Sequence, residues 1–285
     1  MKFDPWGLLR DARYALPRYI ESNAQGPDAA DAARICGRLH CKGLASTVGY
    51  FQAGHTAPET IVAANQAVSA LLADVSGDAY LSVKAPPLSF DEVHIRAIAE
   101  AAAASGLPLM FDAHAPKDAE HTLQMVERLL PDFPGTGCVL PARWGRSLAD
   151  TLRFRDSSAR LRIVKGEWAD PEWNGRRIES GYLALVSSLA GRAGTVAVAT
   201  HQPELAERAL MILLDAGTPC ELEQLRGLPR RRTMAIARRL GVPVRIYVPF
   251  GPGWWPYAVD KALARPYLLS WLIADLLGKR ESAGD

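Results

Sequence analysis

The chain has 285 residues, with 33 basic and 31 acidic side chains and therefore a formal net charge of +2. Apolar residues make up 48% and charged residues 22%, a composition that is typical of a globular protein and excludes a disordered chain. Because the charges nearly balance, composition does not favour nucleic acid as a partner. The length fits either two average domains or one barrel domain.

The cysteines and the terminal sequence indicate the compartment. Cys36, Cys41, Cys138 and Cys220 are too few for a disulfide scaffold, and no second pair completes a zinc site with the C-x4-C of the first two. We therefore expect four reduced thiols. The first residues lack the pattern of a secretory signal, and no apolar run approaches the roughly 18 residues of a membrane span. These features predict a cytoplasmic protein.

Short β-branched runs alternate with Ala- and Leu-rich stretches of helical spacing. The predicted strands are 44–50, 80–83, 108–112, 137–140, 161–164, 195–200, 220–223 and 244–248. The predicted helices between them include 58–73, 91–105, 119–130 and 203–216. Such alternation indicates βαβ units, and eight units predict a (β/α)8 barrel of the TIM type. A doubly wound sheet would alternate in the same way, but its G-x-G-x-x-G and G-x-x-x-x-G-K-[ST] phosphate loops are missing.

The domain prediction follows from the position of the first strand. We expect an N-terminal helical extension over 1–43 and the barrel over 44–285. No linker or low-complexity tract interrupts the chain, so both parts are predicted to form a single domain.

Polar or ionisable residues stand at the carboxyl ends of six predicted strands. They are Lys84, Asp112, Lys165, His201, Glu221 with Glu223, and Tyr247. In barrel enzymes the chemistry collects at these strand ends. Each residue alone could be a solvated loop residue or a helix cap, but together they favour a functional site at one mouth of the barrel.

Other site classes have weaker support. Possible metal ligands are Asp112, His114, His94 and His121, but no H-E-x-x-H or comparable spacing favours a metal. No G-x-S-x-G indicates a serine hydrolase. The basic residues at 230–232, with Arg238 and Arg239, are more typical of a solvated helix face than of a nucleic-acid patch.

Six segments in chain order carry a family resemblance. They are L-S-V-K at 81–84, F-D-A at 111–113, L-R-I-V-K-G at 161–166, A-T-H-Q at 199–202, the stretch 221–227, and V-R-I-Y-V-P-F-G at 244–251. Their order resembles the flavin-dependent proline dehydrogenases, over roughly 44–266. The G-P-G-W-W-P-Y segment at 251–257 also matches and places Tyr257 ten residues after Tyr247.

The resemblance implies FAD bound non-covalently at the strand ends of a (β/α)8 barrel. Members of this family take a hydride from the carbon next to the proline nitrogen and give it to the flavin N5. The product is a cyclic imine, and the electrons then pass to a quinone or another acceptor. In this chemistry the cofactor performs the redox step and the barrel supplies geometry and charge.

The resemblance also implies roles for the matching positions. The expected catalytic residues are Lys84, Asp112, Tyr247 and Tyr257. The expected cofactor-binding residues are Arg162, Lys165, Trp168, Thr200, His201, Gln202 and Glu221. The expected substrate-binding residues are Leu225, Asp260 and Lys261. No metal is implied.

The last helix, expected to cover the pocket, departs from the family where an Arg-Arg pair and a Glu are usual. Those positions are Asp260, Lys261 and Ala264 here. At ~4 Å and an effective dielectric constant of ~20, a carboxylate facing Asp260 is opposed by about 4 kcal/mol. We therefore expect a substrate altered from free proline, with a masked carboxylate or an extra amine. If Lys261 alone holds the carboxylate, or if the helix register shifts and Asp260 points to solvent, proline itself is the expected substrate.

Two further departures leave a second function open. Pro141 replaces a flavin-contacting Gln of the family, and His114 replaces an acidic residue. The alternative to an enzyme is a non-catalytic barrel relative that binds a ligand or a protein partner. An apolar stripe within 267–277 permits at most peripheral membrane contact, although packing against the barrel is the commoner reason for such a stripe.

Overall fold

The computed structural model describes residues 26–75, 77–171 and 178–264, with side chains as far as Val259. Eight parallel strands close into a barrel in chain order. They are β1 (Ala45–Tyr50), β2 (Ala79–Val83), β3 (Leu109–Phe111), β4 (Gly137–Pro141), β5 (Arg160–Val164), β6 (Val196–Ala199), β7 (Cys220–Leu225) and β8 (Val244–Phe250). Pairing of β8 with β1, in which Tyr247 lies opposite Thr47, closes the barrel.

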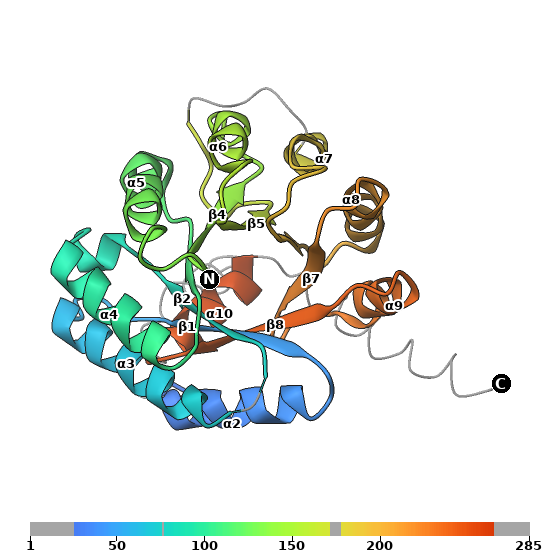
Figure 1. The fold of residues 1–285 in the computed structure, drawn as a ribbon. Helices are drawn as coiled ribbons and strands as arrows, with labels where there is room; N and C mark the ends of the chain where they lie inside the picture. Colours follow the sequence, from blue (N-terminus) through green and yellow to red (C-terminus); the bar gives the residue numbers. More distant parts are fainter. Residues whose placement is uncertain (1–25, 76, 172–177, 265–285) are drawn as a thin grey trace, which may run out of the picture.

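Helices surround the strands (Figure 1). They are α2 (Ala29–His40), α3 (Pro58–Ala73), α4 (Glu92–Ala104), α5 (Ala119–Leu129), α6 (Ser147–Phe154), α7 (Ile178–Ser188), α8 (Pro203–Asp215) and α9 (Arg231–Arg239). A further helix, α10 (Trp254–Ala264), follows the last strand, and two short 3₁₀ turns, η1 (Pro86–Leu88) and η2 (Pro116–Asp118), precede α4 and α5. The predicted (β/α)8 barrel is confirmed.

The apolar residues of each helix recur at helical spacing and face the barrel. In α5, for example, Leu123 and Val126 are buried with Leu129, while the intervening charged residues face outward. The helix α2 lies in the segment predicted before the barrel, and a capping box between Asp28 and Asp31 fixes its start. Residues 1–25 and 267–277 lie outside the described residues, so the division at residue 43 and the membrane stripe remain predictions.

A layer of buried charges closes the amino-terminal end of the barrel. The Arg245 guanidinium is fully buried, and its Nε lies 2.8 Å from a carboxylate oxygen of Glu221, which also pairs with Arg160. The Tyr80 ring lies between the two guanidiniums, with its centroid 3.9 Å from Cζ of Arg245 and 4.2 Å from Cζ of Arg160. Asp78 completes the pairing of Arg245.

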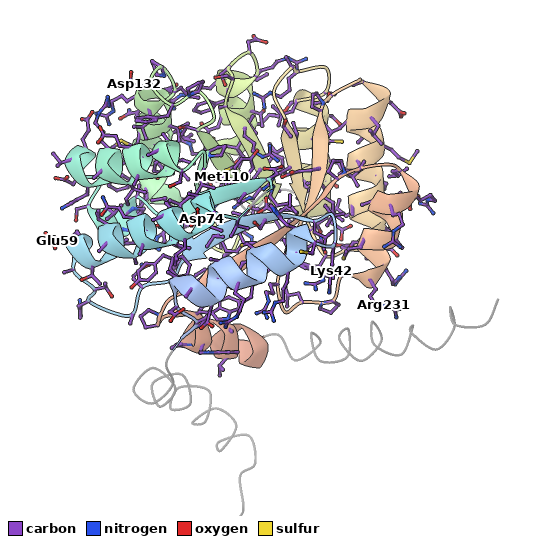
Figure 2. All side chains as sticks on the ribbon, turned by 60° about the horizontal axis from the view of Figure 1, so that its bottom comes forward. Lys42, Glu59, Asp74, Met110, Asp132 and Arg231 are labelled. Carbon is purple, nitrogen blue, oxygen red and sulfur yellow. The ribbon has the colours of Figure 1, made fainter. Side chains whose placement is uncertain are left out.

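Helix α10 lies at one end of the barrel, apart from the surrounding ring of helices (Figure 2). Two glycines permit this position. Gly251 has a positive φ of 99°, and a Cβ there would lie 2.6 Å from the carbonyl oxygen of Phe51. At Gly253, a Cβ would come within 2.1 Å of the Gln52 carbonyl. The chain after β8 therefore passes close against the end of β1, which brings α10 over the carboxyl ends of the strands.

Within the described ranges, no helix combines the length and the apolar character needed to cross a membrane.

Candidate active site

A cavity of about 480 Å³ opens at the carboxyl ends of the strands. This volume lies in the range of small-molecule sites. Its lining is mostly apolar, with a few ionisable side chains from β2, β3, β5, β7 and β8. The lining includes Phe51, Lys84, Asp112, His114, Trp144, Arg162, Glu167, Trp168, His201, Glu223, Leu225, Tyr247 and Tyr257.

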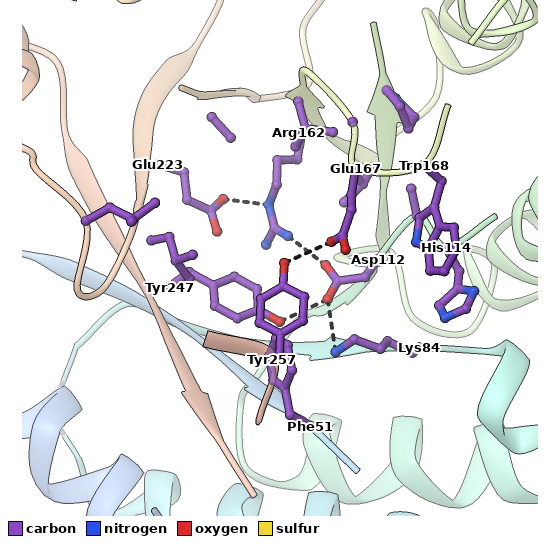
Figure 3. A pocket seen from close by; sticks show the side chains of 18 of the residues that line it. Phe51, Lys84, Asp112, His114, Arg162, Glu167, Trp168, Glu223, Tyr247 and Tyr257 are labelled. Carbon is purple, nitrogen blue, oxygen red and sulfur yellow. Dashed lines mark hydrogen bonds and ion pairs between the residues drawn. The ribbon is translucent and has the colours of Figure 1, made fainter. Parts of the chain in front are cut away.

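Asp112 directly follows β3 and forms the centre of the polar contacts in this cavity (Figure 3). Its Oδ1 accepts hydrogen bonds from Ser82 at 2.7 Å and from Arg162 at 2.9 Å. Its Oδ2 accepts one from the Tyr247 hydroxyl at 2.9 Å and lies 3.6 Å from the Lys84 ammonium. Four groups, from β5, from β8 and from β2 and its carboxyl end, therefore converge on one carboxylate.

The charges around Asp112 determine its protonation. Burial opposes ionisation, but Lys84 and Arg162, with the Ser82 and Tyr247 hydrogen bonds, outweigh burial and lower the pKa of Asp112. Burial, together with the Asp112 charge, raises the pKa of Tyr247 well above its usual value. Asp112 is therefore a carboxylate and Tyr247 a neutral hydroxyl donor near neutral pH.

Arg162 joins Asp112 to a second carboxylate on β7. Its Nε lies 2.7 Å from Oε2 of Glu223, and its Cζ lies 5.4 Å from the centroid of the Tyr247 ring. Burial raises the pKa of Glu223, and Arg162 only partly offsets this effect. Within the described residues, Nη2 of Arg162 and Oε1 of Glu223 are buried without a hydrogen-bond partner. A buried donor and a buried acceptor at one cavity wall are features that a bound polar group would satisfy.

Lys84 lies at the opposite wall from Glu223. Its ammonium donates to the Tyr50 carbonyl at 3.1 Å and lies 4.0 Å from the centroid of the Phe51 ring. Burial lowers the pKa of Lys84, although the Asp112 charge opposes this shift. A lysine with a lowered pKa can exchange a proton more readily near neutral pH than a solvated one.

The mouth of the cavity is bridged by residues from the loop after β5 and from α10. The Tyr257 hydroxyl donates to Oε2 of Glu167 at 2.8 Å, and the two side chains meet in front of Asp112 (Figure 3). Trp168 lies against His114, with ring centroids 5.3 Å apart. The indole of Trp144 donates to the Trp168 carbonyl at 2.9 Å, which holds this loop over the cavity.

A second group of predicted cofactor residues lies beside the cavity, at the ends of β5 and β6. The Lys165 ammonium donates to the side-chain carbonyl of Gln202, and Thr200 Oγ1 accepts from the Gln202 backbone at 3.2 Å. His201 lines the cavity and is held by the backbone: Leu225 N–H donates to its Nε2 at 3.0 Å, so Nδ1 carries the proton toward the Pro229 carbonyl at 2.8 Å.

Glu221 does not join the other predicted site residues. It occupies the closed amino-terminal layer with Arg245, and Glu223 lines the cavity in its place. The two glutamates face the same side of β7, but they are two residues apart, which is about 6.6 Å along a parallel strand. The structure therefore places Glu221 with two arginines, Arg245 and Arg160, away from the cavity.

The remaining predicted residues fall into three sets. Lys84, Asp112, Arg162, Trp168, His201, Leu225, Tyr247 and Tyr257 all line the cavity, while Lys165, Thr200 and Gln202 lie beside it. Asp260, Lys261 and Ala264 belong to α10, but their side chains lie outside the described ones.

Sequence reasoning missed Phe51, Glu167 and Trp144 as cavity residues, and it named Glu223 without assigning it a role. Phe51 directly follows β1, and Glu167 lies three residues after β5. The rule that located Lys84 and Asp112 at strand ends could have found both. Trp144 lies in the loop after β4, and no pattern in the sequence marked it.

Metal binding has no support in the part of the chain that the structure describes. No cluster of three or more His, Cys, Asp or Glu side chains there is arranged to hold an ion.

Comparisons with known proteins bear on the family. No model of a known protein family matches the chain. Proline dehydrogenase 1 of Bacillus subtilis subsp. natto is 25% identical over 272 residues, which cover 89% of this chain and 89% of that protein. Proline dehydrogenase of Deinococcus radiodurans is 25% identical over 165 residues, covering 55% and 53% of the two chains.

Solved structures with the same fold belong to longer proteins. Proline utilization A (PutA) from Bdellovibrio bacteriovorus, inactivated by N-propargylglycine, superposes with a TM-score of 0.72 at 16% identity, over 83% of this chain and 31% of that one. PutA from Corynebacterium freiburgense gives a TM-score of 0.67 at 16% identity, over 87% and 31%. The chain thus spans about a third of these proteins, and this likeness shows the barrel fold. With the curated likeness at 25% identity along most of its length, the chain is similar to proline dehydrogenases.

Proposed function

We propose that the chain is an FAD-dependent oxidoreductase of the proline dehydrogenase type. It oxidises the C–N bond of proline, or of a proline-like cyclic or secondary amine, to an imine, with hydride transfer to the flavin N5. The observation that carries this proposal is the buried cluster of Asp112, Arg162, Lys84 and Tyr247 in a cavity at the carboxyl end of the barrel.

The cavity residues fit a flavin. Arg162 Nη2 is a buried donor and Glu223 Oε1 a buried acceptor, and both lack hydrogen-bond partners among the described residues. A ring that carries carbonyl and N–H groups can satisfy both atoms, and the apolar lining suits its flat faces. When bound, FAD supplies the hydride acceptor. Arg162 then contributes a fixed positive charge, which favours the added electrons without reorganisation.

The oxidation also releases a proton, which a pocket residue must take. The bond between hydrogen and the carbon next to nitrogen breaks, and its electron pair leaves with the hydride. The nitrogen lone pair forms the C=N bond, and the N–H proton of the resulting iminium is then released. Burial lowers the pKa of Lys84, so in this proposal the ammonium first loses a proton to solvent, and the neutral amine then takes the proton from the iminium and becomes an ammonium again beside Asp112.

Asp112 and Tyr247 act as positioning residues for this chemistry. Asp112 keeps Lys84 and Arg162 on opposite sides of one carboxylate, and the Tyr247 hydroxyl fixes the orientation of that carboxylate. A held geometry lowers the entropic part of the barrier, because the reacting groups need not be ordered during the reaction.

The nucleotide part of FAD is assigned to the residues beside the cavity. Lys165, Thr200, His201 and Gln202 lie along the carboxyl ends of β5 and β6, and their side chains are tied to one another or to the backbone. Trp168 closes this side of the mouth with His114. Glu221 has no part in the binding of FAD in this proposal.

The non-catalytic alternative is not favoured, because a protein that only binds a ligand has no need for the buried, paired charges around Asp112. A quinone-type acceptor and a cytoplasmic location are retained as predictions from the sequence.

The proposal is tested by anaerobic reduction of the flavin-loaded protein. The protein is reconstituted with FAD and mixed with proline, proline esters, hydroxyproline, pipecolate and diamines, and the visible flavin absorbance is followed. At least one amine is expected to bleach it. A protein that does not take up FAD, or whose flavin no amine reduces, would contradict the proposal.

A further inference from the structure

We infer that Glu223 binds a proton when the flavin in this cavity is reduced and releases it when the flavin is oxidised. Glu223 acts through Arg162, which it contacts, and is therefore a positioning residue. This inference rests on the proposed function, because FAD must occupy the cavity, and it adds a second proton to the reduction of the flavin. It is carried by the different bonding of two carboxyl groups that share the Arg162 guanidinium.

The two carboxyl groups on Arg162 differ in how many donors they have. Besides the guanidinium, the Asp112 carboxylate accepts hydrogen bonds from Ser82 at 2.7 Å and from Tyr247 at 2.9 Å (Figure 3). Glu223 has one bond, from Arg162 Nε to Oε2 at 2.7 Å, and its Oε1 is buried without a hydrogen-bond partner among the described residues. Donors stabilise the charged form of a carboxyl group. A proton that enters this cluster is therefore expected on Glu223 and not on Asp112.

The other ionisable groups around Glu223 already have partners. They are Arg160 on β5, Tyr182 on α7, His201 after β6, Glu221 on β7, and Arg245 and Tyr247 on β8. Glu223 itself is only 3% exposed. Burial raises its pKa, the Glu221 charge acts in the same direction, and Arg162 with the other two arginines opposes the shift. The charge of Glu223 is thus weakly stabilised for a side chain in contact with an arginine.

Reduction of the flavin gives Glu223 a reason to take a proton. A hydride from the amine brings two electrons and one proton to the ring, which gains one negative charge. A new negative charge in a cavity of low dielectric raises the proton affinity of a nearby carboxylate. Glu223 then takes one proton from solvent and becomes a carboxylic acid, so Arg162 contributes more of its charge to the reduced ring. When an acceptor removes two electrons and the proton of the ring, Glu223 returns its own proton to solvent.

The first measurement is the reduction potential of bound FAD, titrated spectroelectrochemically with redox mediators at a series of pH values. No amine is needed, so the result does not depend on the substrate. Each proton taken up with two electrons adds a slope of about 30 mV per pH unit, which is a tenfold change in the equilibrium constant. Where Glu223 changes its protonation, the wild-type slope should exceed that of Glu223→Gln by this amount. Glu167→Gln removes another carboxylate from the cavity lining and should keep the wild-type slope.

The second measurement identifies the group by infrared difference spectroscopy of the same FAD-loaded protein. Reduction should produce the C=O band of a protonated carboxylic acid. This band should shift when the protein is labelled with ¹³C-glutamate, and it should be absent in Glu223→Gln. The labelled wild type is read by itself, so the measurement is decisive even if Glu223→Gln does not fold.

Three results would overturn the inference and leave the proposed function intact. They are equal slopes in the wild type and Glu223→Gln, no glutamic acid band on reduction of the labelled wild type, and an extra proton that Glu223→Gln keeps but Glu167→Gln or Lys84→Met loses. A protein that does not take up FAD contradicts the proposed function, and the inference fails with it.

Discussion

Arg162 binds Asp112 and Glu223 at the same time, with Nη1 2.9 Å from Asp112 Oδ1 and Nε 2.7 Å from Glu223 Oε2. One guanidinium thus shares its charge between two buried carboxyl groups from different strands. The positive potential that Arg162 contributes to the cavity therefore depends on the protonation of Glu223, whose pKa is raised by burial.

Glu223→Gln should raise the reduction potential of bound FAD. The glutamine retains an oxygen for the Arg162 Nε bond but removes a negative charge, so the added electrons are better stabilised. We expect an increase of about 30 mV, which corresponds to a factor of ten for a two-electron couple. The potential is measured by spectroscopic redox titration at mildly acidic and mildly alkaline pH.

The pH dependence supplies the control for Glu223. Since its pKa is raised, wild-type Glu223 becomes neutral at a higher pH than a solvated glutamate does. The reduction potentials of FAD in the variant and in the wild type should therefore converge as pH falls. A difference in reduction potential between the two proteins that is constant across pH, or a lower potential in Glu223→Gln, would contradict the role assigned to this carboxyl group.

Gly49→Ala should disrupt the Tyr247–Asp112 hydrogen bond. A Cβ at position 49 would lie 1.9 Å from the Tyr247 hydroxyl oxygen, so the ring must move. Overpacking of this kind costs about 1–3 kcal/mol of unfolding free energy, and the rate of flavin reduction should fall with it. Urea unfolding and flavin-reduction kinetics measure the two effects.

Gly37→Ala is the matched control for that substitution. Gly37 lies in α2, and a Cβ there would meet no atom within 4 Å. Alanine should stabilise the helix by up to about 1 kcal/mol and leave flavin reduction unchanged. If Gly49→Ala were as stable and as active as Gly37→Ala, this would contradict the close packing of Gly49 against the Tyr247 hydroxyl.

Glu120→Gln should destabilise the protein at neutral pH but not in acid. Hydrogen bonding from Arg146, helped by Arg153, lowers the pKa of Glu120 to about 2. A lowered folded-state pKa contributes stability above the unfolded pKa of about 4.3, and this contribution is lost as pH falls toward the folded value. Because Glu120 is partly exposed, the effect should be below about 1 kcal/mol.

The pH dependence of Glu120 is measured by urea unfolding of both proteins at neutral pH and at a pH near the folded-state value. The gap in unfolding free energy should shrink in acid. A gap that stays constant or widens would show that the ion pairs between α5 and α6 do not stabilise the folded chain.

The four cysteines should differ in reactivity. All four are free; Cys41 is exposed, Cys36 and Cys138 are buried, and burial raises the pKa of Cys220 to about 11. Since the thiolate is the reactive form, we expect one rapidly reacting thiol in the native protein and the others only on unfolding. Ellman's reagent measures this, and Cys41→Ser should remove the fast phase. Two fast thiols, or a fast phase that survives Cys41→Ser, would be inconsistent with this burial.

The barrel was predictable because its signals are local. Alternation along the chain determines which segments are strands and which are helices. The predicted strand 244–248, for example, begins at the same residue in the structure and continues two residues further, to Phe250. The rule that parallel barrels collect chemistry at the carboxyl ends of strands correctly brought Lys84, Asp112 and Tyr247 together. These residues are far apart in sequence, and their meeting follows from topology alone.

The depth of a residue within the barrel was less predictable. Glu221 and Glu223 have the same parity on β7, so the sequence pattern cannot tell which of them reaches the cavity. The end of β7 at Leu225 and the pairing of Glu221 with Arg245 decide it. Glu167 was missed for a related reason, since its direction depends on the turn at Gly166 and on Tyr257 from a distant helix. Such contacts arise from tertiary packing.

The oxidation of an amine by the flavin-loaded protein is tested most directly by the stoichiometry of a single anaerobic turnover. FAD-loaded protein is mixed with the amine that reduces it fastest, and the reduced flavin and the cyclic imine are quantified in the same sample. We expect one imine for each flavin reduced, with both products lost together in Asp112→Ala. Reduced flavin without imine, or no reduction by any cyclic or secondary amine, would contradict it.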